Sequence, residues 1–179
     1  MSTDPQLIHN ALRSLPNALF VLTCAFDKYR TGILTSWVQQ CSSEPPILVV
    51  AVKKGQTIEP LLRDARAFVL NMMPAGDRRS IHRFGKPLDR SDDPFLSIDF
   101  DTAVTGMPIL KNALGWFDCE LEGHLSPDAD CRLYLGRVVA ANIRTRLKID
   151  KPVSVVIPVP DKRPSRKKAP KKVASKRNM

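Results

Sequence analysis

The sequence lacks the motifs of several common enzyme classes. It has no G-x-G-x-x-G, which holds a dinucleotide on a Rossmann fold, and no G-x-x-x-x-G-K-[ST], which wraps a nucleotide phosphate. It also lacks the H-E-x-x-H of zinc peptidases and the G-x-S-x-G of α/β-hydrolases. A binding site in this chain therefore has to be built in another way.

Histidine and cysteine are too few and too scattered for a catalytic triad or a metal cage. The histidines are His9 in a predicted helix, His82 in a basic turn and His124 on a polar strand face, and we interpret all three as surface residues. The four cysteines, Cys24, Cys41, Cys119 and Cys131, have no C-x-x-C spacing, and three of them lie in apolar, strand-like segments. This pattern is typical of free thiols in a reducing cytoplasm and predicts no structural disulfide and no zinc site.

Long apolar runs are absent as well. No run approaches the roughly 20 residues that a membrane-spanning helix needs. Residues 1–16 have no apolar segment of the kind that signal peptides carry. We therefore expect a cytoplasmic protein that has no membrane partner.

The basic charge is confined to one end of the chain. Of the 28 Lys and Arg residues, nine lie in residues 162–179, which contain no acid, so that residues 1–161 hold 19 basic and 18 acidic groups. This division predicts one domain over residues 1–160 and a disordered basic tail over residues 161–179. The tail could contact nucleic-acid phosphates, but it has no aromatic residue for base stacking. Solubility or loose tethering to acidic partners is the simpler role.

Short strands dominate the predicted secondary structure. Apolar β-branched runs and period-2 alternation predict seven strands, the first two of which form a hairpin around a turn at 27–32. The strands cover residues 18–26, 33–38, 47–52, 67–73, 115–125, 131–143 and 153–159. Helices are predicted after Asp4, Thr57 and Asp77, which are favourable N-cap residues, and residues 85–108 form a long irregular loop. Many short strands with few helices favour an antiparallel β-barrel or β-sandwich.

The stretch from Thr31 to Val52, TGILTSWVQQCSSEPPILVVAV, places neutral hydrogen-bonding groups beside a buried strand. None of these groups is a strong acid, a strong base or a favoured metal ligand. A flat ring with many neutral acceptors, such as a flavin, would need small hydroxyls and exposed main-chain N–H groups of this kind. A flavin also carries its own redox chemistry, so the protein needs no acid or base for that step.

A phosphate seat is predicted directly after this stretch. Lys53 and Lys54 precede Gly55, and Thr57 opens a helix whose N-terminus offers free N–H groups and about half a positive charge. An ordinary capped helix beside a solvated lysine pair is the competing interpretation, because this spacing is not specific.

Residues 30–73, RTGILTSWVQQCSSEPPILVVAVKKGQTIEPLLRDARAFVLNMM, resemble the flavin reductase-like domain family of FMN-binding split barrels. That family has a G-x-T-x-S-type strand, a Ser- or Thr-containing turn, Pro-Pro and then an apolar strand. The later GMPIL, FDCEL and LYLGRVV are similar to its second half, so the resemblance covers roughly residues 8–145. It implies a mainly β fold, an antiparallel Greek-key split β-barrel with a few short peripheral helices, and FMN as cofactor. The Trp after Thr-Ser is similar to members fused to, or acting with, larger flavoprotein electron-transfer systems.

The resemblance implies a set of cofactor-binding residues in three groups along the chain. The ring or ribityl chain would be lined by Leu34, Thr35, Ser36 and Trp37, with Phe84 near the ring edge. Main-chain and hydroxyl contacts to the flavin and its phosphate would come from Cys41, Ser42 and Ser43. The phosphate would be held by Lys53, Gln56 and Thr57, which agrees with the helix-terminus argument. Plain core packing is the competing interpretation for Trp37 and Phe84.

One position departs from the family pattern. Reductases of this family often carry Gly-Asp-His before an L-x-L-G-x-V strand, and that histidine is associated with the nicotinamide. Here the stretch is DADCRLYLGRVV, so Asp130 keeps the acid while Cys131 replaces the histidine. The departure bears on direct NAD(P)H use and leaves FMN binding untouched. Since no neighbouring group predicts a lowered thiol pKa, we expect Cys131 to be inert, and no catalytic residue is assigned.

Two functions follow from these residues. The first is an FMN-dependent oxidoreductase that moves electrons from NAD(P)H through bound FMN to a free flavin, a metal chelate or a protein partner. The second is an FMN flavoprotein without NAD(P)H activity of its own, which serves as a partner-dependent electron carrier. In the family, FMN lies at an interface between two subunits, and this implies a homodimer.

Overall fold

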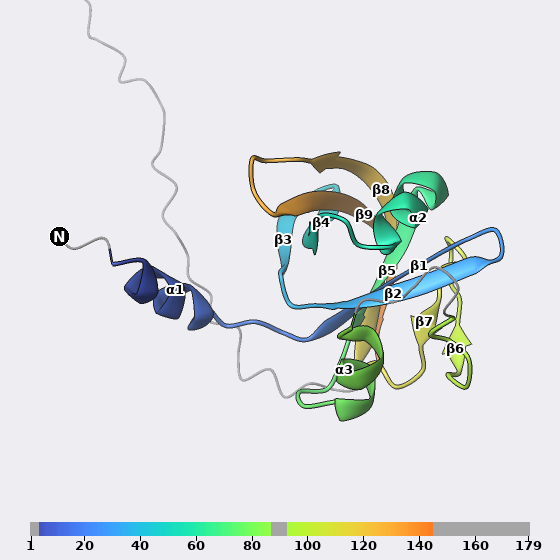
Figure 1. Cartoon of the computed structure of the whole chain (residues 1–179). Helices are drawn as coiled ribbons and strands as arrows, with labels where there is room; N and C mark the ends of the chain where they lie inside the picture. The colour runs from blue at the N-terminus through green and yellow to red at the C-terminus, as the bar shows by residue number, and fades with distance from the viewer. Residues whose placement is uncertain (1–3, 87–92, 145–179) are drawn as a thin grey trace, which may run out of the picture. The chain divides into compact units, whose positions relative to one another are not determined.

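The computed structural model describes residues 4–86 and 93–144 (Figure 1). These residues belong to one compact unit. The strand expected at 153–159, the domain end expected at residue 160 and the basic tail expected at 161–179 lie outside the described residues.

A seven-stranded antiparallel sheet forms most of the described fold (Figure 1). Its strands are β1 (Phe20–Phe26), β2 (Tyr29–Thr35), β3 (Val38–Ser43), β4 (Pro46–Lys53), β5 (Ala67–Met72), β8 (Gly115–Leu125) and β9 (Cys131–Ile143). Their order in space is β2-β1-β5-β8-β9-β4-β3. A separate pair is formed by β6 (Phe100–Asp101) and β7 (Ile109–Leu110). The expected mainly β, antiparallel architecture is confirmed.

The two edge strands of the sheet, β2 and β3, follow each other in the chain. Only Ser36 and Trp37 separate the last residue of β2 from the first residue of β3. Three Cα steps span at most about 11 Å, so the two edges of the sheet must approach each other at this point. The sheet therefore curls into a barrel that remains split between β2 and β3.

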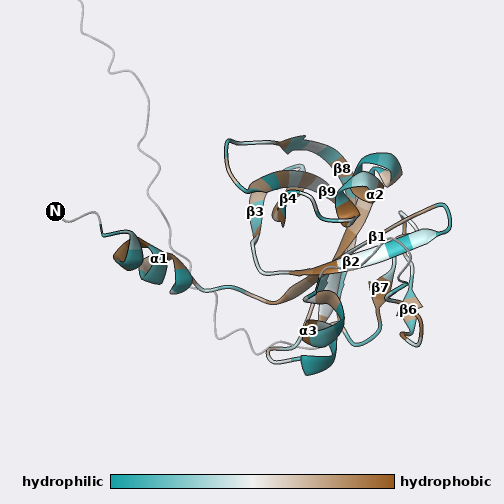
Figure 2. Cartoon of the chain, in the orientation of Figure 1, coloured by the Kyte–Doolittle hydropathy of each residue, from teal (hydrophilic) through white to brown (hydrophobic). Residues whose placement is uncertain are grey.

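The register of the strands turns apolar side chains into the barrel. Leu22 of β1 pairs with Leu70 of β5, and both are fully buried. Figure 2 shows β1 and β5 as predominantly apolar strands. Gly136 of β9 leaves room for the Phe68 ring, since a Cβ at this glycine would lie 2.4 Å from the ring Cζ. The core is thus continuous between β1, β5 and β9.

Three short helices accompany the sheet: α1 (Pro5–Arg13), α2 (Ile58–Ala65) and α3 (Arg78–Phe84). Asp4 and Asp77 cap α1 and α3 as expected, because each carboxylate accepts a hydrogen bond from a backbone N–H of the first turn. Helix α2 buries Ile58 and Leu62, whereas α1 has no buried residue. No helix in residues 4–86 and 93–144 combines the length and apolarity needed to cross a membrane.

The expected hairpin at the start of the sheet has a shorter turn than predicted. Strand β2 begins at Tyr29, and the turn consists of Asp27, with a left-handed φ of 55°, and Lys28. The predicted turn at 27–32 was too long because charged residues at the tip of an exposed hairpin resemble loop residues. The predicted strand at 33–38 is interrupted at Ser36 and Trp37, where the chain crosses the split.

Strand β3 was not predicted. Its residues are polar and mostly exposed, since an edge strand has only one strand to cover it. Pairing with β4, from Val38 opposite Val50 to Ser43 opposite Pro46, holds it in the sheet. The expected break at 42–46 shrinks to the short turn between β3 and β4. Main-chain hydrogen bonds to β4 thus define a strand that the side-chain pattern of the sequence does not predict.

Candidate functional site

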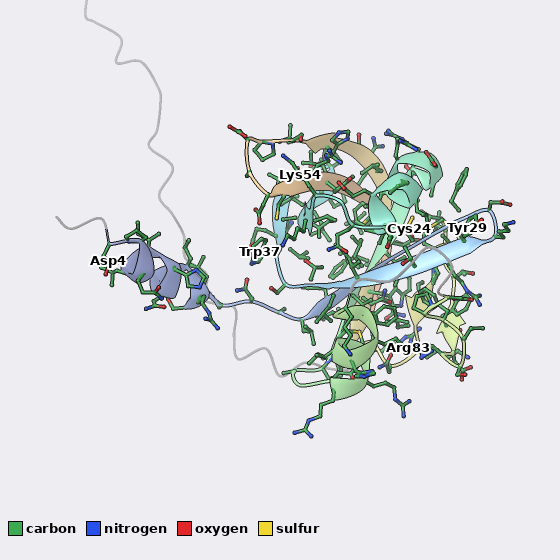
Figure 3. All side chains as sticks on the ribbon, viewed as in Figure 1. Asp4, Cys24, Tyr29, Trp37, Lys54 and Arg83 are labelled. Carbon is green, nitrogen blue, oxygen red and sulfur yellow. The ribbon has the colours of Figure 1, made fainter. Side chains whose placement is uncertain are left out.

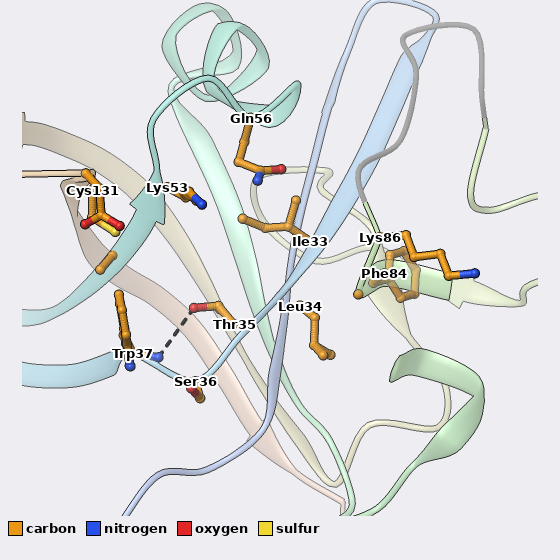
Figure 4. A pocket seen from close by; sticks show the side chains of 13 residues that line it. Ile33, Leu34, Thr35, Ser36, Trp37, Lys53, Gln56, Phe84, Lys86 and Cys131 are labelled. Carbon is orange, nitrogen blue, oxygen red and sulfur yellow. Dashed lines mark hydrogen bonds between the residues drawn. The ribbon is translucent and has the colours of Figure 1, made fainter. Parts of the chain in front are cut away.

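A cavity of about 390 Å³ opens where the chain crosses the split between β2 and β3 (Figure 4). Most of the expected cofactor-binding residues line it, namely Leu34, Thr35, Ser36, Trp37, Lys53, Gln56 and Phe84. Its other lining residues are Ile33, Ala51, Gly85, Lys86, Asp130 and Cys131. The volume falls in the range of about 300–1,000 Å³ that small-molecule sites occupy.

Hydrogen bonds hold the crossing between β2 and β3 in place beside this cavity. The Trp37 N–H lies 3.4 Å from Thr35 Oγ1, and the Trp37 carbonyl accepts a hydrogen bond from the Ala51 N–H at 3.0 Å. The Trp37 side chain is 59% exposed, and Figure 3 shows it beside the start of β3. Core packing, the competing interpretation for Trp37, is therefore wrong.

The two lysines after β4 have different roles. Lys53 lines the cavity, whereas the Lys54 ammonium donates a hydrogen bond to the Pro127 carbonyl at 2.9 Å. The Lys54 N–H also donates to the Asp130 carbonyl at 2.9 Å, which ties this residue to the start of β9. Only Lys53 of the pair is therefore placed to neutralise an anion in the cavity.

The loop that leads into α2 is held by a carboxylate rather than by the expected cap. Thr57 occupies the N-cap position, but its side chain makes no capping hydrogen bond. Instead, Glu59 Oε2 accepts a hydrogen bond from the Gly55 N–H at 2.8 Å, and Gly55 adopts a φ of 85°. Glycine suits this left-handed conformation, and the bond fixes the main chain next to Gln56.

Two residues of β9 fix Glu59 in turn. Glu59 Oε1 accepts hydrogen bonds from Arg132 Nη1 at 2.5 Å and from the Tyr134 hydroxyl at 3.0 Å. Tyr134 is 3% exposed, and burial raises the pKa of its hydroxyl, so Tyr134 stays a hydrogen-bond donor at neutral pH. The Glu59–Arg132–Tyr134 network thereby ties the loop before α2 to β9.

Cys131 stands at the cavity wall as a protonated thiol. It is 8% exposed, and burial together with the neighbouring Asp130 raises the pKa of the thiol, against the smaller opposite effect of Lys53 and Lys54. A raised pKa removes the thiolate that redox or nucleophilic chemistry would need. None of the three histidines lines the cavity: His9 is in α1, His82 in α3 and His124 in β8.

Phe84 serves both the core and the cavity. It is 2% exposed, its ring packs against the Phe95 ring with the centroids 5.9 Å apart, and it lines the cavity from the end of α3. A Cβ at Gly32 would lie 3.0 Å from the Phe84 ring, so the bare backbone of β2 lets the ring approach. Packing in the core, the competing interpretation for Phe84, therefore accounts for most of the burial of this side chain.

Four expected residues lie elsewhere. Cys41, Ser42 and Ser43 belong to the far end of β3, and Thr57 lines a neighbouring groove instead of the cavity. At about 3.3 Å per residue, Cys41 is roughly 13 Å along the chain from Trp37, and it is not among the residues that line this cavity. The roles that the resemblance implies for these residues remain predictions.

The lining also contains residues that the sequence did not single out. Ala51 could have been found from strand periodicity, because it lies two residues before Lys53 on the same face of β4. Gly85 and Lys86 follow α3 in the stretch that was expected to be an irregular loop, and no local pattern marks them. Within the described ranges, no group of three or more His, Cys, Asp or Glu side chains could hold a metal ion.

A model of the flavin reductase-like domain matches residues 12–154. The chain belongs to the flavin reductase-like domain family. Diflavin flavoprotein A 1 of Synechocystis sp. is 31% identical over 119 residues, which are 66% of this chain and 21% of that protein. The chain thus spans about a fifth of the length of the diflavin flavoproteins that it matches.

Solved structures of flavin-binding proteins superpose on the described fold. The NADH:FAD oxidoreductase SgcE6 of Streptomyces globisporus superposes with a TM-score of 0.72 at 19% identity, covering 80% of this chain and 86% of that chain. An FMN-binding protein from Thermus thermophilus gives a TM-score of 0.67 at 25% identity, covering 73% of each chain. The expected split-barrel fold is confirmed, and the family supports a flavin-related oxidoreductase.

The cavity fits a flavin nucleotide in its chemistry. The hydroxyl-bearing residues Thr35 and Ser36 suit the neutral acceptors and donors of the ring, and Leu34, Ala51 and Phe84 give apolar walls. Lys53 and the amide of Gln56 gather at the side next to α2, where a phosphate would find one cation and hydrogen-bond donors.

Proposed function

We propose that this chain is an FMN-dependent oxidoreductase of the flavin reductase type. Electrons from NAD(P)H would pass to a free flavin, a metal chelate or a protein partner. The observation that carries the proposal is the meeting, in one cavity, of the Thr35–Trp37 crossing with Lys53 and Gln56. Segments about 20 residues apart in the chain thus supply ring contacts and phosphate contacts at the same place.

Each wall of the cavity would have a separate part in binding. Thr35 and Ser36 would hydrogen-bond the ring, Lys53 and Gln56 would neutralise and orient the phosphate, and the exposed Trp37 indole would shield the ring from water at the rim. Bound FMN supplies the redox chemistry, so the chain needs no ionised thiol or imidazole in the cavity. The raised pKa of Cys131 agrees with this division of labour.

A visible spectrum of the purified protein, before and after anaerobic addition of NADH, tests both parts of the proposal. Bound FMN gives flavin absorbance bands, and reduction by NADH bleaches them. A colourless protein that fails to take up added FMN would contradict the proposal. A yellow protein that NADH and NADPH both fail to bleach favours the second function below.

That second function is an FMN-binding electron carrier without NAD(P)H activity of its own. Cys131 favours it, because the cavity has a neutral thiol where many family members carry histidine. Reduction by a partner flavoprotein but not by NADH is the expected result for such a carrier.

A homodimer would complete the site. The cavity lies at the edge of the sheet, Trp37 is exposed beside it, and the apolar residues Leu7, Ile8 and Leu12 of α1 are all more than half exposed. A second subunit could cover such surfaces through a two-fold interface. Light scattering should report a dimer at micromolar concentration, and a monomer that retains FMN would contradict this arrangement.

All four cysteines are free, which supports the expected cytoplasmic setting.

A further inference from the structure

The outer side of helix α3 is strongly basic. Residues 78–86, RRSIHRFGK, contain four Lys or Arg and no Asp or Glu, whereas the rest of residues 1–161 holds 15 basic and 18 acidic groups. We call the four charged side chains, Arg78, Arg79, Arg83 and Lys86, the α3 basic patch. Figure 2 shows the outer part of α3 as hydrophilic. A positive surface on a body that is otherwise not basic favours a partner of opposite charge.

The α3 basic patch keeps its charge. Within residues 4–86 and 93–144, no carboxylate forms an ion pair with any of its four side chains. Arg83 is bound to main-chain oxygens, because its Nε donates to the Pro94 carbonyl at 2.7 Å and its Nη2 donates to the Leu96 carbonyl. Asp93, which precedes these two residues, pairs with Arg30 at 2.6 Å. A carbonyl oxygen is neutral, so it orients the guanidinium without cancelling its charge.

The patch borders the flavin cavity, which is the cavity at the split between β2 and β3. Phe84 and Lys86 line that cavity. Phe84 and Arg79 also line a second groove, of about 330 Å³, whose other charged lining residues are Lys111 and Asp99. The flavin cavity and this groove therefore meet at Phe84, the last residue of α3. A protein seated on α3 would lie directly beside the flavin cavity.

The surface around the patch suits a protein better than a nucleic acid. Ile81 is 41% exposed among the arginines, and an apolar contact with a charged rim is typical of protein interfaces. Phe84, the aromatic residue of this segment, is 2% exposed and offers no surface for base stacking. Asp77 Oδ2 accepts hydrogen bonds from Ser80 Oγ at 2.7 Å and from Asn112 Nδ2 at 3.0 Å. These bonds fix the helix that carries the patch.

We propose that the α3 basic patch is the docking site of an acidic protein that carries single electrons and exchanges them with FMN in the adjoining cavity. The charge favours an acidic surface, and the exposed Ile81 gives the contact an apolar centre. Two reduced carriers would deliver one electron each, and solvent would supply two protons, so that bound FMN is reduced to FMNH2. The inference rests on the proposed flavin site and names the class of its protein partner.

Isothermal titration calorimetry of the full, FMN-loaded chain with a plant-type [2Fe–2S] ferredoxin, a strongly acidic carrier, tests the docking. Arg78→Gln/Arg79→Gln should weaken ferredoxin binding about fivefold or more at low salt, because charges at the rim of an interface steer the partner. Both side chains are exposed and neither lines the flavin cavity, so FMN binding should stay unchanged. Arg78→Lys/Arg79→Lys keeps both charges and should bind ferredoxin like the unaltered chain. Added salt should weaken the binding.

The matched control is Lys171→Gln/Lys172→Gln, which removes two charges from the basic C-terminal segment and should leave ferredoxin binding unchanged. An equal or larger loss in this control overturns the inference. The absence of any loss in the α3 variant overturns it as well, and so does a ferredoxin that does not bind at all. A single-stranded oligonucleotide is the second probe. If the α3 variant weakens oligonucleotide binding and leaves ferredoxin binding unchanged, the patch serves nucleic acid and the inference is overturned.

Anaerobic reduction separates the docking from the flavin. Plant-type ferredoxins are strong reductants, and reduced ferredoxin should bleach the flavin bands more slowly in the α3 variant than in the unaltered chain. Photochemical reduction, which needs no docking, should be equally fast in both. Docking without any reduction of the flavin would overturn the electron-carrier role. Failure of the chain to take up FMN would instead contradict the proposed function, while ferredoxin binding can still be measured on the unloaded chain, so the two failures are distinguishable.

Discussion

The carboxylate of Glu59 holds the backbone of Gly55, with Glu59 Oε2 accepting the Gly55 N–H at 2.8 Å. The other oxygen of Glu59 is bound to Arg132 and Tyr134 on β9. One acidic side chain thus sets the position of the loop that carries Gln56 into the cavity. We infer that Glu59 is a positioning residue for the phosphate seat and does not itself touch the cofactor.

Glu59→Gln should weaken FMN binding about tenfold relative to the unaltered protein. Charge-assisted hydrogen bonds contribute about 1.5–3 kcal/mol each, and an amide retains only part of that. Because the network positions the phosphate seat, the affinity for riboflavin, which has no phosphate, should fall much less. The measurement is the ratio of the two dissociation constants by fluorescence titration.

Glu122→Gln is the matched control for this change. Glu122 pairs with Arg137 on the same β8–β9 hairpin but lines neither the flavin cavity nor the neighbouring groove that Thr57 lines. It should leave both affinities unchanged. Equal losses of FMN and riboflavin in Glu59→Gln would assign the network to general stability and contradict a positioning role.

Substitutions of the two adjacent lysines, Lys53 and Lys54, should have different effects on FMN binding. Lys53→Met removes a cation from the cavity wall and should weaken FMN binding by about 1.5 kcal/mol, roughly tenfold, with little effect on riboflavin. Lys54→Met should leave FMN binding within about twofold of the unaltered protein, because its ammonium is turned toward Pro127. A larger loss for Lys54→Met would reverse the assignment of the phosphate contact.

The sequence predicted the strands that form apolar runs or alternate polar and apolar residues, and it missed the polar edge strand β3. Strands β8 and β9 match their predicted limits because polar and apolar residues alternate along much of their length. Strand β3 escaped prediction because its stability comes from pairing with β4, and its residues Gln39 and Gln40 face water on the edge of the sheet.

The site was predictable where residues are close in sequence and missed where the fold brings distant segments together. Thr35, Ser36 and Trp37 line the cavity as expected, and so does Lys53. Nothing local in the sequence indicates that Glu59 would bind Arg132, 73 residues later, or that the Gly55–Glu59 hydrogen bond would hold the loop in place of the Thr57 cap. Such long-range polar networks depend on the register between strands, which patterning does not supply.

Cys131→His should strengthen the use of NADH without changing FMN binding. The resemblance associates a histidine at this position with the nicotinamide, and the side chain at 131 lies in the cavity wall. We expect the KM for NADH to fall about tenfold, the equivalent of one good hydrogen bond. Steady-state NADH oxidation measures this. Cys131→Ser, which is similar in size and equally neutral, should leave the KM for NADH unchanged. An equal fall of this KM in both variants would show that the histidine is not the cause.

Buried thiols should make the protein less stable in alkali. Burial raises the pKa of Cys24 from 9.0 to about 12, and burial likewise raises the pKa of Cys119 to about 12. Below pH 9 both thiols are protonated in the folded and the unfolded chain. Above pH 9 only the unfolded chain loses these protons, so stability falls as the pH rises from 9 toward 12. At pH 10 each thiol should lower the free energy of unfolding by about 1 kcal/mol relative to pH 8.

Cys24→Val tests this source of pH dependence. Valine is close to cysteine in size and does not ionise, so the drop in stability between pH 8 and pH 10 should shrink by about 1 kcal/mol in urea titrations. Cys119→Val should give a similar reduction, and the double variant should add the two. A variant that loses as much stability as the unaltered protein over this interval would show that other groups control the alkaline transition.

Two glycines of the β8–β9 hairpin should respond in opposite ways to the same substitution. A Cβ at Gly136 would lie 2.4 Å from the Phe68 ring and 2.8 Å from Cys119 Cβ, whereas a Cβ at Gly123 would meet nothing within 4 Å. Gly136→Ala should therefore destabilise the barrel by about 1–3 kcal/mol, the usual cost of overpacking a filled core. Gly123→Ala should be neutral or slightly stabilising, because alanine reduces the conformational freedom of the unfolded chain. Urea unfolding of both variants decides the matter, since equal effects would mean that the contact of Gly136 with Phe68 does not limit the packing of the core.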